Sequence, residues 1–155
     1  MALFEGHPAP DFSLAGSDGK THSLGDYAGR TLVIYFYPKD NTSGCTKEAC
    51  AFREMHAELQ DMDVTLLGVS RDNLASHDKF IAKFGLPFVL LSDPETAMMQ
   101  AYDAFGEKKL YGKVSQGTIR STVVIGPDGT VVKHWPKVKN AEAHPAEVLA
   151  YLRSH

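Results

Sequence analysis

Cysteine is scarce in this sequence: the chain of 155 residues has only two, Cys45 and Cys50. The sequence also lacks eighteen consecutive apolar residues, so it predicts no membrane-spanning helix. It has no excess of basic residues, because the formal net charge is -3 and the pI is near 6.1. General electrostatic attraction to nucleic acid or to an anionic membrane is therefore not expected.

The start of the chain lacks the features of a secretory signal. The stretch "MALFEGHPAPDF" carries Glu5, His7 and prolines where a signal peptide needs an uninterrupted apolar core. We therefore expect a cytoplasmic protein. In a reducing compartment, a pair of cysteines is more often catalytic, redox-active or metal-binding than a structural disulfide. A buried, inert side chain is the alternative for either cysteine.

No repeat, low-complexity stretch or linker divides the chain, and its length is typical of one domain, so residues 1–155 are predicted to form a single domain. Residues 12–14 and 22–24 flank Asp18-Gly19, a turn signal that predicts a small N-terminal hairpin. The run "TLVIYFY" from Thr31 to Tyr37 is continuously apolar. It predicts a central strand covered on both faces, which Pro38 would end.

A succession of strands and helices follows. Apolar residues at three- and four-residue steps predict a helix over 43–59, and further helices are predicted over 74–84 and 145–153. Strands are predicted over 64–70 and 88–92, and residues 120–135 read as a hairpin around Pro127-Asp128-Gly129. The basic stretch 106–113 reads as a solvated loop. The sum is an α/β protein with a mixed sheet and helices on both of its faces.

The two cysteines fall at the start of the helix predicted over 43–59. A cysteine is nucleophilic only as the thiolate, which a helix N-terminus or a nearby cation favours. Thr42 and Ser43 are both good N-cap residues, so Cys45 would lie in the first helical turn, near free N–H groups and the positive end of the helix dipole. Lys47 would point away on a helix. Any cation beside Cys45 must therefore come from elsewhere in the fold.

The spacing of the cysteines does not suit a permanent disulfide. Five residues along an ideal helix give a Cα separation of roughly 8 to 9 Å, whereas a disulfide needs less than about 7 Å. If the two sulfurs pair, the first turns of the helix must unwind. The sequence thus predicts a reduced, helical state and an oxidised, locally unwound state.

The residues "PKDNTSGC" fit the signature Pro-x-x-x-Thr-x-x-Cys, with Pro38, Thr42 and Cys45 at its fixed positions. The chain here resembles the peroxiredoxins, and the wider stretch "YFYPKDNTSGCTKEACAFRE" resembles their bacterioferritin comigratory protein or PrxQ branch. The resemblance extends along nearly the whole chain through "GHPAPDFSL", "LLSDPE" and "RSTVVIGPDGTV". It implies a thioredoxin-like fold.

The resemblance also implies a role for each matching residue. Cys45 corresponds to the peroxidatic cysteine, which attacks peroxide and becomes a sulfenic acid, and Cys50 to the resolving cysteine, which closes an intramolecular disulfide. Thr42 corresponds to the threonine whose hydroxyl helps to hold peroxide and thiolate. Pro38 corresponds to the proline that shields the pocket, and Arg120 to the arginine brought against the thiolate from a distant strand. Ser43 departs from the proline that this branch often carries, but serine is itself a favourable N-cap residue.

The activity implied is that of an antioxidant thiol peroxidase, reducing hydrogen peroxide and organic hydroperoxides and recycled by thioredoxin. This chemistry needs no cofactor, and the spacing of Cys45, Cys50 and His56 does not match a zinc site. The single-chain cysteine pair makes a monomer sufficient. Two other functions stay open: a thiol-disulfide oxidoreductase on the same fold, and a redox-sensing or holdase protein.

Plainer interpretations of single residues stay open beside these roles. Cys50 could be a buried bystander while another molecule supplies the resolving thiol. Arg120 could be a surface ion-pair residue, and Pro38 could serve as a strand terminator, a role compatible with shielding the pocket.

Overall fold

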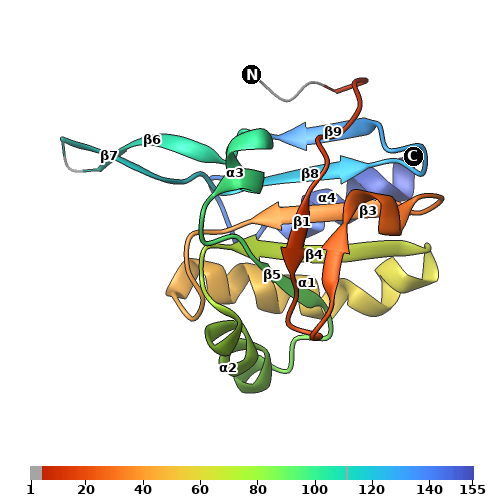
Figure 1. The fold of residues 1–155 in the computed structure, drawn as a ribbon. Helices are drawn as coiled ribbons and strands as arrows, with labels where there is room; N and C mark the ends of the chain where they lie inside the picture. The colour runs from red at the N-terminus through yellow and green to blue at the C-terminus, as the bar shows by residue number, and fades with distance from the viewer. Residues whose placement is uncertain (1–4, 111) are drawn as a thin grey trace.

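A computed structural model describes residues 5–110 and 112–155 of the chain (Figure 1). Its strands are β1 (Ser13–Ala15), β2 (Thr21–Ser23), β3 (Thr31–Phe36), β4 (Val64–Ser70), β5 (Val89–Ser92), β6 (Phe105–Leu110), β7 (Lys113–Thr118), β8 (Ser121–Ile125) and β9 (Val131–Trp135). Its helices are the 3₁₀ helix η1 (Leu24–Tyr27) and the α-helices α1 (Ser43–Asp61), α2 (Leu74–Phe84), α3 (Ala97–Ala101) and α4 (His144–Ser154).

Five strands form a mixed sheet in the order β5-β4-β3-β8-β9. Strand β3 lies at its centre, parallel to β4 on one side and antiparallel to β8 on the other. The side chains of its residues 32–36 are buried, as a strand covered on both faces requires. The strand ends before Pro38, which cannot donate to a ladder. The predicted mixed sheet and its central strand are therefore confirmed.

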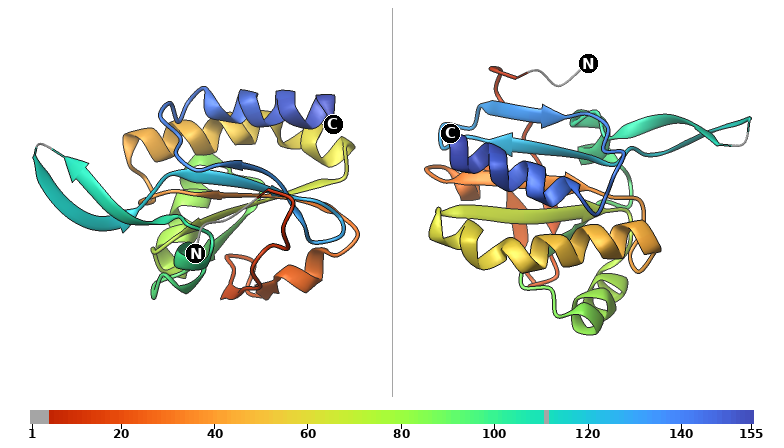
Figure 2. Two further views of the ribbon diagram at one scale, coloured as in Figure 1. Left: turned by 90° about the horizontal axis from the view of Figure 1, so that it is seen from above. Right: turned by 180° about the vertical axis from the view of Figure 1, so that it is seen from behind.

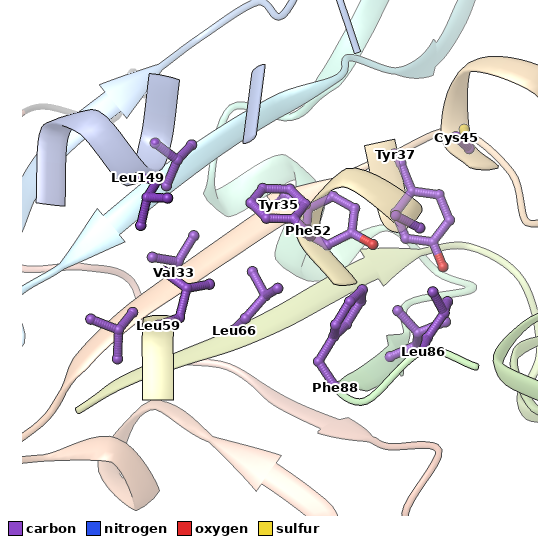
Figure 3. Close-up of a cluster of buried hydrophobic side chains, with 14 of the residues drawn as sticks. Val33, Tyr35, Tyr37, Cys45, Phe52, Leu59, Leu66, Leu86, Phe88 and Leu149 are labelled. Carbon is purple, nitrogen blue, oxygen red and sulfur yellow. The ribbon is translucent and has the colours of Figure 1, made fainter. Parts of the chain in front are cut away.

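Successive residues of β3 enter two separate cores because side chains alternate across a strand. Val33 and Tyr35 pack with α1, α2 and α4, whereas Ile34 and Phe36 pack with α3 and the N-terminal segment. Figure 2 shows α1 and α4 side by side against one face of the sheet. Figure 3 shows the cluster on that face, with Cys45 at one end of it in this view.

The predicted elements are found close to their expected bounds. The strand over 64–70 and the helix over 74–84 match β4 and α2, and α1 extends two residues beyond the predicted helix 43–59. The N-terminal hairpin forms by antiparallel pairing of β1 with β2, and β8 and β9 form the second predicted hairpin.

The interpretation of residues 106–113 as a solvated loop was wrong. Residues 106–110 lie in β6, Gly112 lies in the turn before β7, and Lys113 begins β7, while Tyr111 is outside the described residues. The two strands pair antiparallel and project from the body as an arm (Figures 1 and 2). Among the residues of the arm whose side chains are described, Phe105 at the start of β6 packs against one of the main cores. Alternating apolar residues are few here. Periodicity therefore gave little sign of these strands. Helix α3 was also not predicted.

Candidate active site

Cys45 is the third residue of α1 and its side chain is buried, with 2% of the residue exposed. Thr42 occupies the N-cap position in extended geometry, and the N–H of Thr46 donates to its carbonyl at 2.8 Å. The sulfur therefore lies beside the first helical turn, where N–H groups have no partner within the helix. This is the position that the N-cap residues predicted.

The cation beside Cys45 is Arg120, which lies immediately before β8 and 75 residues away along the chain. Its Nη2 donates to the Cys45 sulfur at 3.1 Å. The antiparallel pairing of β8 with β3 brings the start of β8 beside the end of β3, where α1 begins. The sheet register thus brings together two segments that the sequence keeps far apart.

Glu48 holds the other side of the guanidinium. Arg120 Nη1 donates to its Oε1 at 2.6 Å, and the Glu48 side chain is fully buried. Glu48 follows Cys45 by three positions on α1, so both side chains lie on one helix face. Among the described residues no donor reaches Glu48 Oε2.

Burial and charge act in opposite directions on this ion pair. Burial is the largest influence on Glu48 and raises its pKa to about 7, although the charge and hydrogen bond of Arg120 partly offset it. Burial also disfavours the charge of Arg120, but the neighbouring Glu48 carboxylate and Cys45 sulfur outweigh that effect and raise the pKa of Arg120. The guanidinium therefore stays charged beside the sulfur at neutral pH.

Two further residues near Cys45 have well-defined positions. The Thr42 hydroxyl donates to the Lys39 carbonyl at 2.9 Å, which leaves its oxygen lone pairs free to accept. Pro38 is half-buried and follows the end of β3 by two residues. Both belong to the short connection from β3 to α1.

Cys50 is half-buried on the same helix, and both cysteines are free thiols. Helix α1 is continuous through both positions. The structure therefore describes the reduced, helical state that the five-residue spacing predicted.

Sequence reasoning missed two residues of this site. Glu48 gave no signal beyond its helical spacing from Cys45, because an isolated glutamate on a helix is usually solvated. Gly44 was not singled out either. A methyl group built on Gly44 would lie 3.4 Å from Arg120 Nη2, so this residue lies next to the guanidinium.

A buried thiol facing a guanidinium and free helix N–H groups is suited to reaction as a thiolate. The same donors can stabilise negative charge that moves onto a leaving oxygen. Such a site suits attack by the Cys45 sulfur on a polarisable bond of an uncharged substrate.

Comparison with known proteins decides the family. The model of the AhpC/TSA family matches residues 6–134, which is most of the chain. The chain belongs to this family. The peroxiredoxin Bcp of Bacillus subtilis is 44% identical over 153 residues, covering 99% of this chain and 97% of that protein. The chain is thus a peroxiredoxin, an enzyme that reduces peroxides with a cysteine thiol, as the sequence predicted.

Solved structures agree with this assignment. A mutant form of PrxQ from Xylella fastidiosa superposes on this peroxiredoxin with a TM-score of 0.92 and 37% identity, covering 100% of this chain and 98% of that one. A bacterioferritin comigratory protein from Xanthomonas campestris gives a TM-score of 0.90 and 43% identity over 98% and 99% of the two chains. That structure is described as giving insights into alkyl peroxide reduction activity. The thioredoxin-like fold expected from the sequence is confirmed.

Within 5–110 and 112–155, no three or more His, Cys, Asp or Glu side chains gather as a metal site would need. In the same part of the chain, no helix combines the length and the apolar character needed to cross a membrane.

Proposed function

We propose that this peroxiredoxin reduces hydrogen peroxide and small organic hydroperoxides through Cys45, with Cys50 as the resolving thiol. The observation that carries the assignment of Cys45 is the 3.1 Å contact between its sulfur and Arg120 Nη2. Cys45 is held at a helix N-terminus against a partly buried guanidinium, whereas Cys50 lies further along the helix. The alkyl peroxide reduction attributed to the Xanthomonas relative supports the inclusion of organic hydroperoxides.

In the first step, the Cys45 thiolate attacks one peroxide oxygen and the O–O bond breaks. The attacked oxygen stays on sulfur as a sulfenic acid, and the other leaves and takes a proton to become water or an alcohol. Arg120 faces the reacting sulfur, where its charge stabilises the thiolate and the charge that develops on the leaving oxygen. Thr42 would accept a hydrogen bond from the peroxide O–H with its free lone pairs, and Pro38 would limit access of water.

In the second step, the Cys50 thiol condenses with the sulfenic acid, so an S–S bond forms and water leaves. The first turns of α1 unwind to let the sulfurs meet. An external dithiol then reduces the bond by exchange and is itself oxidised to a disulfide. We infer that this dithiol is thioredoxin, that the enzyme acts in the cytoplasm as a monomer, and that residues 1–155 form one domain.

The test is intact mass and free-thiol content after one equivalent of hydrogen peroxide, without reductant. The wild type should lose about 2 Da and both thiols, as expected for a disulfide. Cys45→Ser should not react. Cys50→Ser should gain about 16 Da as the sulfenic acid persists, or should form mixed disulfides.

Two results would contradict the proposal. Unchanged peroxide consumption by Cys45→Ser would remove Cys45 from the reaction. Full thioredoxin-supported cycling by Cys50→Ser would show that another thiol resolves Cys45.

A further inference from the structure

A second buried charged group lies next to the segment Pro38–Thr42, which connects β3 to α1. His77 of α2 is fully buried, and both of its ring nitrogens face acceptors. Its Nδ1 lies 2.7 Å from Asp40 Oδ2 and its Nε2 lies 2.9 Å from the Leu91 carbonyl oxygen. A neutral imidazole has a single N–H and can donate to only one of them. To donate to both acceptors, the His77 ring must carry a proton on each nitrogen. The pair with Asp40 therefore holds one more proton than a neutral imidazole beside a carboxylate would.

Asp40 connects this pair to the active site. It is the middle residue of the connection from Pro38 to Thr42, and its side chain is only 2% exposed. Besides His77, its carboxylate accepts hydrogen bonds from the Tyr37 hydroxyl at 2.5 Å and from Ser76 Oγ at 2.8 Å. Asp40 thus ties the connection to the N-terminal part of α2.

Two further hydrogen bonds hold the connection to the same region. The Asp40 N–H donates to Asp72 Oδ2 at 2.8 Å, and Lys83 Nζ of α2 donates to Asn41 Oδ1 at 3.2 Å. Asn41 has a φ of 61°, an unfavourable conformation that these contacts help to hold. Beyond the cysteines, Arg53 Nη1 donates to the Phe84 carbonyl at the end of α2, at 2.6 Å. Helix α2 therefore contacts the chain both before Cys45 and after Cys50.

We propose that His77 is a positioning residue for the peroxide reaction: its protonated pair with Asp40 fixes the segment Pro38–Thr42 against Cys45, and loss of the shared proton releases that segment. The proposal rests on the proposed function, because the segment matters only if Cys45 reacts with peroxide. His77 touches neither cysteine and acts through Asp40.

The surroundings of the pair favour the proton. Burial opposes the charge of His77, but the hydrogen bond and charge of Asp40, the Leu91 carbonyl and the charge of Asp72 outweigh it and raise the pKa of His77. Tyr37 stays neutral, because burial raises its pKa well above the usual value. Strand β5 supplies the Leu91 carbonyl. Two further cations of α2, Lys79 and Lys83, line the cleft beside Asp40.

The raised pKa of His77 predicts how the positioning of the segment Pro38–Thr42 changes with pH. The extra proton stabilises the folded pair fully below the ordinary histidine pKa of about 6.5, and this stabilisation is lost as pH rises through the raised folded-state pKa. The rate of Cys45 oxidation should therefore fall on the alkaline side of that pKa, although a more alkaline solution favours thiolate in general.

The test measures two rates separately by rapid quenching and mass spectrometry, from about pH 6 to pH 9. One is the second-order rate of sulfenic acid formation with hydrogen peroxide, and the other is the rate of disulfide closure. His77→Gln should slow the first by about tenfold at neutral pH, because the positioning is lost, and should abolish its alkaline fall. Disulfide closure should not slow.

A matched control comes from the N-terminal hairpin. His22 of β2 is also buried and hydrogen-bonded to an aspartate, with Nε2 2.9 Å from Asp18 Oδ1, but it lies away from the segment Pro38–Thr42. His22→Gln should keep both the wild-type rate and the wild-type pH profile. Because His77→Gln leaves the buried Asp40 carboxylate without its cationic partner and can fail to fold, the double variant Asp40→Asn/His77→Gln is measured beside it. It should fold and still oxidise slowly, without the alkaline fall.

A spectroscopic measurement needs no variant. Long-range ¹H–¹⁵N spectra of the wild type at neutral pH should show both ring nitrogens of His77 protonated. An unprotonated ring nitrogen at pH 7, or a wild-type rate and pH profile in the folded double variant, would overturn the positioning role. Failure of the proposed function would look different, because the wild type itself would then form no sulfenic acid at Cys45.

Discussion

Glu48 is a buried carboxylate whose burial is only partly compensated. One of its carboxylate oxygens accepts from Arg120, while no donor among the described residues reaches the other. Removing a carboxylate from water is costly unless each oxygen finds a partner. Burial therefore raises the pKa of Glu48 to about 7 despite the adjacent guanidinium. The residue that orients Arg120 titrates close to neutral pH.

This titration has a predictable effect on stability. The folded state binds the Glu48 proton more tightly than the unfolded state, so the stabilising contribution is complete below about pH 4.5 and is lost as pH rises through about 7. Glu48→Gln cannot lose a proton. Relative to the wild type, its free energy of unfolding should improve by about 3 kcal/mol between pH 4.5 and pH 8. Urea unfolding of both proteins at several pH values measures this difference, and a constant difference would contradict the prediction.

The proposed reaction cycle requires helix α1 to be stable enough to present Cys45 and weak enough to unwind toward Cys50. Its first turn has no side-chain cap, because the Thr42 hydroxyl bonds to the Lys39 carbonyl instead of to a helix N–H. An N-cap hydrogen bond typically contributes about 1 kcal/mol, so its absence eases unwinding at this end. In the middle of the helix, Arg53 hydrogen-bonds to the end of α2. Unwinding is thereby favoured between these two points.

A change in helix propensity between the cysteines should alter the rate of disulfide closure. Lys47 is exposed on α1, and glycine there costs about 1 kcal/mol of helix stability relative to alanine. Lys47→Gly should close the disulfide about fivefold faster than Lys47→Ala after oxidation by peroxide, since about 1.4 kcal/mol corresponds to tenfold. Rapid acid quenching followed by mass spectrometry gives the closure rate.

The control for this comparison lies on the same helix. Ala57 is exposed and follows Arg53, outside the part expected to unwind. Ala57→Gly makes the same change in propensity and should leave disulfide closure at the wild-type rate. Equal acceleration by both glycine variants would mean that α1 unwinds as a whole.

For the molecule as a whole, the central sheet separates two hydrophobic cores. The core that contains Cys45 lies beneath α1, α2 and α4, while the other lies beneath α3 and the N-terminal segment. The candidate active site thus lies at the end of the first core, and few of its side chains belong to the second core. Local unwinding of α1 can disturb the first core at its edge while the second keeps the sheet in place.

Core substitutions on the two faces should act independently. Leu59 and Ile125 are each about 1% exposed and belong to different cores. Leu59→Ala should lower the free energy of unfolding by about 2–5 kcal/mol, and Ile125→Val by about 0.5–1.5 kcal/mol, through lost burial and residual cavities. The double variant should lose the sum to within about 0.5 kcal/mol in urea unfolding. A larger departure from additivity would show that the sheet couples the cores.

The sequence by itself determined the local features of this protein. Apolar runs and turn residues predicted β3, β4 and α2 because strand and helix periodicities are local properties. The N-cap residues before Cys45 predicted its place in the first helical turn, and the signature around Pro38 and Thr42 indicated the family. The five-residue spacing of the cysteines predicted the free thiols of the helical state.

The tertiary structure decided what depends on contacts between distant segments. The resemblance named Arg120 as the cation for Cys45, but the pairing of β8 with β3 brings it there and orients it through Glu48. The His77–Asp40 pair spans 37 residues and depends on how α2 packs against the connection after β3. The arm of β6 and β7 was missed because its strands carry few alternating apolar residues. Burial and partner geometry arise only when the chain has folded, so the charge state of Glu48 and His77 could not be predicted from the sequence.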